Sequence, residues 1–298
     1  MSKTVAWIKA FRLRTLPLSL SGIIVGSSIA LDQGHWNTTI FFLAMLTTLF
    51  FQILSNLAND LGDSLKGADN EHRVGPMRSV QSGLISVFEM KMAVVIFVLL
   101  SLSTAIPLII VGVEGLPKLI LYLYTGLAIA AIIAAITYTM GKKAYGYSGL
   151  GDVFVFIFFG GVSVLGVYTL YAKTVDYTAA LMALTVGLLS VAVLNLNNMR
   201  DQINDANVGK RTLVVKIGFK AAKLYHSGLI IGAFVSLIIY SLATSTAFLI
   251  SLLPFSLLFI HLTKVWRTTT PKELDPELKK VALSTFLIAL LFLIAVFI

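Results

Sequence analysis

The sequence predicts an all-α integral membrane protein, a single domain over residues 1–298 with about nine transmembrane helices. Composition is the first reason, because 57% of the residues are hydrophobic and 12% are charged, against about 25% charged in soluble domains. The mean hydropathy of +0.91 agrees with this. The second reason is a series of long apolar runs, and the third is a one-sided distribution of basic residues.

The apolar runs have the length that a membrane-spanning helix needs, roughly 20 residues for about 30 Å of hydrocarbon. They cover residues 16–31, 38–58, 92–113, 116–138, 150–171, 177–196, 224–243, 246–262 and 281–298. Helices are expected because backbone groups in lipid must bond to each other, and because the runs lack the period-two alternation of a barrel strand.

The basic residues predict the orientation. If the N-terminus is cytoplasmic, every one of the 23 Lys and Arg residues except Lys118 and Lys173 lies on the cytoplasmic side. Such a bias follows the positive-inside rule and predicts a multi-pass protein of the cell membrane. The net charge of +9 is spread over five segments, so it indicates topology and not nucleic-acid binding. The absence of cysteine excludes disulfides, thiolate metal sites and a cysteine nucleophile.

Two long polar segments on the predicted cytoplasmic side, 59–91 and 198–223, resemble each other. One opens within NLANDLGD and the other within NLNNMRDQIND. They follow the second and sixth runs, so an even number of spans separates them and both face the same side, as in a parallel repeat. We therefore expect two similar four-helix halves plus a terminal helix around a central cavity.

Asparagine and aspartate recur four residues apart in both segments. Asn59 and Asp63 form one pair, and Asp201 and Asp205 form the other. On a helix, such residues share a face, so each pair projects oxygen atoms in one direction. Unpaired carboxylates beside hydrocarbon are costly, and Mg²⁺ would neutralise them, because it prefers oxygen ligands shared with substrate phosphates. The cations nearby could bind phosphate oxygens: Lys66, Arg73, Arg78, Lys142, Lys210 and Arg211.

A simpler interpretation is that these acids cap helices or pair with loop bases. It is the favoured interpretation for Asp60 or Glu71 taken alone. Helix capping, however, gives no reason for the same four-residue spacing to occur in both segments. The repeated spacing therefore favours a site for diphosphate and magnesium.

The segments NLANDLGDSLKGAD, RVGPMRSVQSG, YGYSGLGDVFVFIFFGGVSVLG and VLNLNNMRDQINDANVGKRTL together resemble the UbiA superfamily of intramembrane prenyltransferases, over nearly the whole chain. The resemblance implies that one set of residues binds Mg²⁺ and diphosphate: Asn59, Asp63, Asp69, Asp201 and Asp205. It implies diphosphate contacts from Tyr138 and Lys142, which match a YxxxK pattern, and from Lys66, Arg78 and Arg211. Asp63, Asp201, Tyr138 and Lys142 are the expected catalytic residues. The superfamily's usual last acid of the first motif is replaced by Gly67, and Asp69 follows two residues later.

Within the superfamily the segments are most similar to the branch that prenylates 1,4-dihydroxy-2-naphthoate in menaquinone biosynthesis. The implied reaction transfers a polyprenyl group from polyprenyl diphosphate, with loss of CO₂ and diphosphate, to give demethylmenaquinol. Arg12 and Arg14 are candidates for binding the naphthoate carboxylate. One alternative is another aromatic or haem prenyltransferase of the same superfamily. A secondary transporter is disfavoured, because no Asp, Glu, Lys or Arg lies near the middle of any run.

Overall fold

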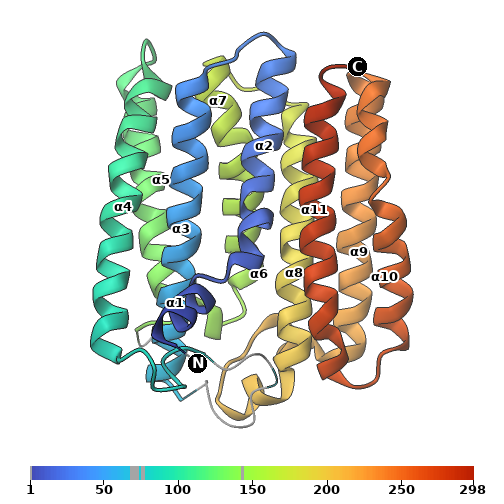
Figure 1. Ribbon diagram of the computed structural model, residues 1–298. Helices are drawn as coiled ribbons and strands as arrows, with labels where there is room; N and C mark the ends of the chain where they lie inside the picture. Colours follow the sequence, from blue (N-terminus) through green and yellow to red (C-terminus); the bar gives the residue numbers. More distant parts are fainter. Residues whose placement is uncertain (1, 68–73, 75–77, 142–143) are drawn as a thin grey trace.

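The computed structural model describes residues 2–67, 74, 78–141 and 144–298, and within them the chain is helical without strands. Nine helical segments of this part of the chain are long and apolar enough to cross a membrane, which confirms the predicted fold class (Figure 1). The elements are α1 (Lys3–Phe11), η1 (Leu13–Thr15), α2 (Leu16–Asp32), α3 (Thr38–Leu65), α4 (Val87–Val113), α5 (Lys118–Thr137), η2 (Tyr145–Tyr147), α6 (Gly151–Val155), η3 (Phe156–Gly166), α7 (Val167–Ala172), α8 (Ala179–Asn207), α9 (Leu213–Ala243), η4 (Thr246–Leu252), α10 (Phe255–Arg267), η5 (Pro271–Leu274) and α11 (Asp275–Ala295).

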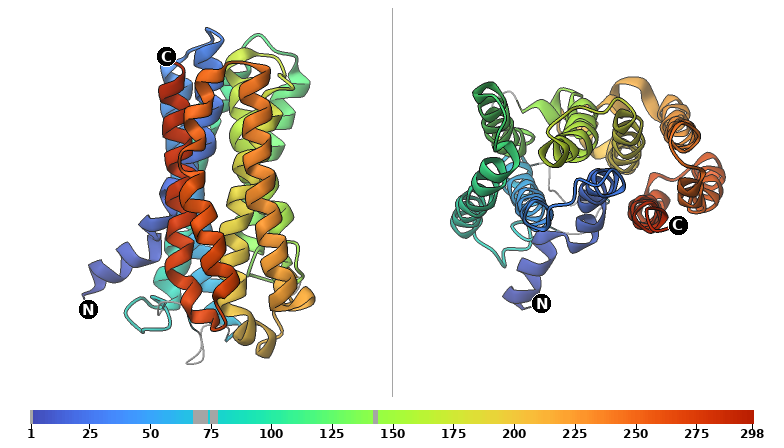
Figure 2. Two further views of the ribbon diagram at one scale, coloured as in Figure 1. Left: turned by 90° about the vertical axis from the view of Figure 1, so that its right-hand side faces the viewer. Right: turned by 90° about the horizontal axis from the view of Figure 1, so that it is seen from above.

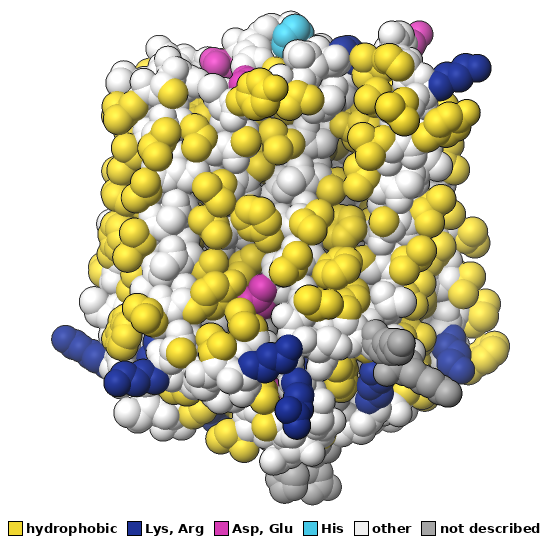
Figure 3. All heavy atoms as spheres, turned by 180° about the vertical axis from the view of Figure 1, so that it is seen from behind, with side chains coloured by type: hydrophobic (Ala, Val, Ile, Leu, Met, Phe, Trp, Pro, Cys, Tyr) yellow, Lys and Arg dark blue, Asp and Glu magenta, His cyan; other side chains and the backbone are white. Residues whose placement is uncertain are grey.

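The long helices stand side by side as one bundle, and the short helix α1 leaves it sideways at one end (Figure 2). Large apolar side chains cover the outside of the bundle, including Phe42, Leu99 and Leu119, which are more than half exposed. In Figure 3, Lys and Arg side chains gather below this apolar surface, near one end of the molecule. The distribution is that of a protein whose flanks contact lipid.

Two helices are longer than the hydropathy pattern predicted. The second run was expected to end at residue 58 and the sixth at 196, whereas α3 continues to Leu65 and α8 to Asn207. The paired motifs therefore lie on the last turns of these helices and not in the loops after them. Hydropathy locates the part of a helix that meets hydrocarbon, whereas the backbone hydrogen bonds continue beyond it. Helix α9 likewise begins at Leu213 instead of residue 224, and it bends at Gly218, where φ is +80°.

The fifth span is irregular, because its middle, Phe156–Gly166, is a π-helix (η3) between α6 and α7. Helix α2 packs tightly on this segment. A Cβ atom at Gly26 would lie 2.6 Å from the Val164 carbonyl oxygen, and a Cβ at Gly22 would lie 2.7 Å from the Ser163 Cβ. Both positions therefore need glycine. Single-turn π-bulges inside helices are frequent at functional sites, and the present segment lines the cavity described next.

Candidate active site

A cavity of about 1040 Å³ runs between the helices, and its polar end, lined by α1 residues and by Asn59 and Asp63, is here called the mouth. Its lining follows α3 from Ala44 to Asp63, which is about 28 Å at a rise of 1.5 Å per residue. Toward the far end the lining is apolar and includes Ile109, Val162 and Leu170. The cavity could therefore hold a long apolar chain beside a polar head group.

The last turns of α3 form one side of the cavity mouth. The Asp63 carboxylate is buried and accepts a hydrogen bond of 3.0 Å from the Tyr147 hydroxyl. Asn59 lines the cavity one turn earlier, and its buried Oδ1 atom has no hydrogen-bond partner among the described residues. Close packing fixes this turn, because a Cβ at Gly62 would lie 2.2 Å from the Thr139 Oγ1 atom. The glycine thus lets α3 approach the segment that carries Tyr138.

The last turns of α8 carry the second motif. The Lys210 Nζ atom lies 3.7 Å from an oxygen of Asp205. Both oxygens of Asp201 accept from the neighbouring Arg200, at 2.9 Å from Nε and 2.6 Å from Nη2. The same guanidinium donates to Asn197 at 2.8 Å and forms an ion pair with Asp275 at the start of α11. Arg200 therefore ties the second motif to the C-terminal helix.

Lys210 and Tyr147 connect the two motifs. Burial by itself would lower the pKa of Lys210, but the carboxylates of Asp63 and Asp205 raise that pKa above its ordinary value. Burial and the nearby Asp63 carboxylate raise the pKa of the Tyr147 hydroxyl, which therefore remains neutral. The Lys66 Nζ lies 4.0 Å from the centre of the Tyr147 ring, a cation–π distance. The two motifs therefore lie close together, with the Lys210 ammonium group and the Tyr147 side chain between them.

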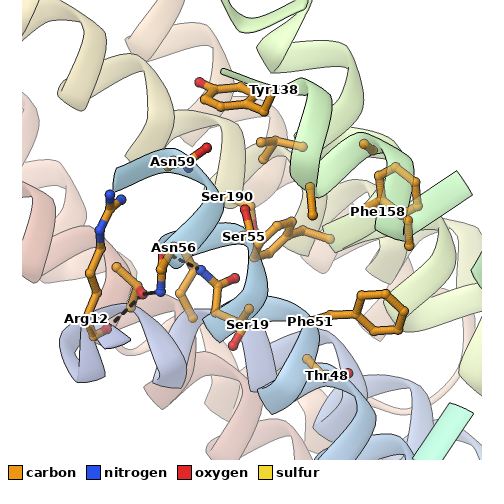
Figure 4. Close-up of a pocket in the computed structure, with 18 of the residues that line it drawn as sticks. Arg12, Ser19, Thr48, Phe51, Ser55, Asn56, Asn59, Tyr138, Phe158 and Ser190 are labelled. Carbon is orange, nitrogen blue, oxygen red and sulfur yellow. Dashed lines mark hydrogen bonds between the residues drawn. The ribbon is translucent and has the colours of Figure 1, made fainter. Parts of the chain in front are cut away.

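Asp60 faces different partners from Asp63. Its Oδ1 atom accepts from Arg12 Nη2 at 2.7 Å and from Arg78 Nη1 at 2.8 Å. Figure 4 shows Arg12 and Asn56 on one side of the pocket, with Tyr138 and Phe158 on the opposite side. The carboxylate of Asp60 therefore holds two cations, while that of Asp63 faces the Tyr147 hydroxyl.

Other predicted residues have the following positions. Tyr138 lines the cavity, and burial raises its pKa to about 12. Arg211 is exposed at its side chain and donates its backbone N–H to the Tyr147 carbonyl at 3.1 Å. Asp69 and Lys142, predicted as a metal ligand and a diphosphate contact, lie outside the described residues.

An aromatic wall lines the cavity beside the motifs. It consists of Tyr138, Tyr145, Phe154 and Phe158. Tyr145 stacks on Phe154 with ring centres 4.0 Å apart, and Tyr138 meets Tyr145 edge-on at 5.2 Å. The faces of such rings carry negative quadrupole charge, so this wall can stabilise a cation while it excludes water.

Tyr147 and Arg200 are site residues that the sequence interpretation did not single out. Arg200 adjoins Asp201 in the chain, which is a usable signal, but its partner Asp275 is 75 residues away. Tyr147 lies in the YGYSGLGD segment, whose tyrosines gave no reason to prefer one over another.

The oxygen atoms at the mouth fit Mg²⁺. They are carboxylate and amide oxygens, the hard ligands that this ion prefers, and the buried Asn59 Oδ1 has an unused acceptor. Within the described part of the chain no three acidic or histidine side chains cluster closely enough to hold an ion by themselves. Proteins usually bind Mg²⁺ through one or two carboxylates plus substrate phosphates, which complete its oxygen shell.

Carboxylates and cations at the mouth of a long apolar cavity in a membrane bundle define an intramembrane site for a ligand with an anionic head and an apolar tail. The sequence comparison identifies the protein more closely. Residues 19–286 match the UbiA prenyltransferase family, and the chain belongs to that family.

Curated relatives and solved structures agree with this membership. The chain is 41% identical to the 1,4-dihydroxy-2-naphthoate octaprenyltransferase of Escherichia coli (strain K12), over 100% of this chain and 96% of the relative. It is 40% identical to the enzyme of the same name from Haemophilus influenzae, over 97% and 95%. A solved UbiA homolog from Archaeoglobus fulgidus, bound to GPP and Mg²⁺, superposes with a TM-score of 0.68 at 15% identity, over 98% of both chains. The likeness to that structure shows the fold.

Proposed function

We propose that this protein transfers a polyprenyl group from polyprenyl diphosphate to 1,4-dihydroxy-2-naphthoate in a Mg²⁺-dependent reaction, releasing CO₂ and diphosphate and forming demethylmenaquinol. The observation that carries the reaction class is the polar end of the cavity, which Asp63 and Lys210 line and where Lys210 also pairs with Asp205, while the far part of the cavity is apolar. The choice of acceptor is supported by the two relatives about 40% identical over their full length. Another aromatic or haem acceptor has no comparable support.

The residues that would hold the metal are Asn59 and Asp63 from α3, Asp201 and Asp205 from α8, and Asp69. Asp201 already accepts two bonds from Arg200, but a carboxylate has about four acceptor positions and can bind an ion as well. When bound, the ion supplies Lewis-acid stabilisation of the charge that builds on the departing diphosphate.

The chain's own cations bind the other diphosphate oxygens. Lys210 lies between the motifs and, with its raised pKa, remains protonated at neutral pH. We assign the same task to Lys66, Arg78, Lys142 and Arg211, and a hydrogen-bonding role to Tyr138. Preorganised donors of this kind stabilise a leaving group because they need no reorientation during the reaction.

The allylic C–O bond then breaks, and its electron pair leaves with the diphosphate. The aromatic wall, Tyr138, Tyr145, Phe154 and Phe158, faces the resulting allylic cation and keeps water from it. The electron-rich naphthoate ring forms the new C–C bond. CO₂ departs, and the electron pair of its broken bond restores the aromatic ring.

We further propose that the N-terminus and the active-site mouth face the cytoplasm in the cell membrane. The basic side chains at that end of the molecule support this orientation through the positive-inside rule (Figure 3).

The test is a direct assay. Purified protein in lipid or detergent is incubated with 1,4-dihydroxy-2-naphthoate, a polyprenyl diphosphate and Mg²⁺, and the prenylated product is followed by mass spectrometry. Parallel samples contain EDTA or the Asp63→Ala variant. Product that disappears in both parallel samples supports the reaction and the metal site together.

Two results would contradict the proposal. Turnover with 4-hydroxybenzoate or haem in place of the naphthoate would keep the family and replace the acceptor. No turnover with any acceptor, in protein that melts cooperatively, would reject the enzymatic assignment.

A further inference from the structure

Arg12 has an unusual backbone conformation at the cavity mouth. It links α1 to η1 with φ +51° and ψ +56°, a left-handed conformation that residues other than glycine rarely adopt. Side-chain hydrogen bonds hold the turn. Asn56 donates to the Phe11 carbonyl at 3.0 Å and to the Thr15 hydroxyl at 3.3 Å, and Thr15 donates to the Arg12 carbonyl at 2.9 Å. Conformations of this kind persist where surrounding structure imposes them, and they are concentrated at functional sites.

The side chain of Arg12 is also held in place. Its Nη2 atom donates to Asp60 at 2.7 Å, and its guanidinium lines the cavity. The buried Nε atom of Arg12 has no hydrogen-bond partner among the described residues. An unused charged donor in a partly buried position is costly unless a ligand completes it.

Local charge separates this position from the metal side of the mouth. Arg12, Arg78 and Asp60 together carry one net positive charge. On the metal side, Asp63 and Asp205 are balanced by Lys210 and Lys66, so these four side chains carry no net charge. An additional anion without a metal is therefore favoured beside Arg12.

We propose that Arg12, positioned by Asp60, binds the carboxylate of the acceptor. This inference rests on the proposed function, because it concerns the carboxylate-bearing aromatic substrate of that reaction. Asp60 is a positioning residue in this scheme, because its Oδ1 atom holds the guanidinium groups of Arg12 and Arg78.

The position suits an attack on the allylic carbon. Asp60 and Asp63 are three residues apart on α3, so the acceptor carboxylate and the diphosphate would be bound about one helical turn, roughly 5 Å, apart. Gln52 and Ser55 line the cavity on the same helix, one to two turns deeper, and can hydrogen-bond the ring hydroxyls. The aromatic wall lies across the pocket, so the ring of the acceptor and the allylic end of the tail would face each other (Figure 4).

The experiment measures binding of 1,4-dihydroxy-2-naphthoate under anaerobic conditions, without Mg²⁺ or prenyl diphosphate, by the fluorescence of the naphthalene ring. The comparison ligand is 1,4-dihydroxynaphthalene, which lacks the carboxylate. Arg12→Gln should weaken binding of the naphthoate by about tenfold to a hundredfold, the effect of one charged hydrogen bond, and leave the comparison ligand unchanged. Arg267→Gln removes an exposed arginine on α10 and should change the affinity for neither ligand.

Two more variants keep the test decisive if Arg12→Gln unfolds. Arg12→Lys retains the charge but lacks the fork of donors, so it should lose part of the preference for the carboxylate ligand. Asp60→Asn should reduce that preference as well, since the guanidinium is then held less firmly. In turnover assays, both variants should raise KM for the naphthoate and leave KM for the prenyl diphosphate within about twofold of the unaltered protein, about 0.4 kcal/mol.

The opposite pattern would overturn the inference. If Arg12 variants raise KM for the prenyl diphosphate and leave the preference for the carboxylate ligand intact, Arg12 binds the diphosphate, while the proposed function stands. If the unaltered protein neither binds nor prenylates the naphthoate, the proposed function itself has failed.

Discussion

Asp60 and Asp63 are three residues apart on α3, yet their carboxylates have different partners. Asp60 accepts from two arginines, whereas Asp63 accepts from a tyrosine hydroxyl and faces Lys210. Removing charge at the two positions should therefore have different consequences. Asp63 is the acid that we expect to act on the metal and diphosphate.

Asp63→Asn should lower kcat by about two to three orders of magnitude, as expected for the loss of one preorganised electrostatic group. The fold should persist, because the side-chain amide oxygen can still accept from the Tyr147 hydroxyl. Product formation at saturating substrate and thermal melting measure the two effects. The control is Asp32→Asn, the same change at an exposed position at the other end of the bundle. Equal activity in both variants would exclude Asp63 from the site.

Arg200 is important at the residue scale for a different reason. Its side chain is 1% exposed and pairs with Asp201 and Asp275. Arg200→Met would leave Asp201, which is 7% exposed, buried without its cation. Breaking such a pair costs about 3–5 kcal/mol, so unfolding of the variant in detergent should occur at a clearly lower temperature. Arg267→Met, at an exposed position, should lie within about 0.5 kcal/mol of the unaltered protein. A loss below about 1 kcal/mol in Arg200→Met would show that water replaces the arginine.

At the scale of the elements, the sequence predicted the number and order of the spans but not where each helix ends. The ends of α3 and α8 are polar, so hydropathy could not assign them, although their spacing of four residues is a helical signal. The sequence also could not predict the π-helix η3, because a continuous apolar run is equally compatible with an α-helix. Helix α2, which packs on this segment, lies more than 100 residues earlier in the chain.

Packing of α2 on η3 can be tested with a matched pair of glycines. At Gly26 a methyl group would lie 2.6 Å from the carbonyl oxygen and 3.2 Å from the Cα of Val164, and backbone atoms cannot rotate away. Gly26→Ala should therefore cost about 1–3 kcal/mol. Gly126, in α5, has no atom within 4 Å of the added position, so Gly126→Ala should be neutral or stabilising by about 0.5–1 kcal/mol. Thermal unfolding should rank Gly126→Ala highest and Gly26→Ala lowest. The reverse order would show that η3 can move away from α2.

At the scale of the whole molecule, the sequence placed both acidic motifs at one end of the bundle, because both follow an even number of crossings. It predicted a central cavity, but not which residues line that cavity or which residues connect the two motifs. Lys210 and Tyr147 meet at Asp63 only because the loops after α5 and α8 fold toward α3. Ion pairs such as the one between Arg200 and Asp275 connect distant segments, and one sequence without its relatives carries little trace of them.

The orientation of the whole molecule gives the last prediction. The chain contains no cysteine, so each engineered cysteine is the only target for a thiol reagent. Lys118→Cys lies exposed at the start of α5, and Lys272→Cys lies exposed in η5, at the opposite end of the bundle. In intact cells, a membrane-impermeant maleimide should label Lys118→Cys at once and Lys272→Cys only after permeabilisation, because the positive-inside rule places the basic end in the cytoplasm. Labelling in the reverse order would turn the active-site mouth outward, where a cytoplasmic prenyl diphosphate could not reach it. Labelling of both in intact cells would mean that the chain inserts in two orientations.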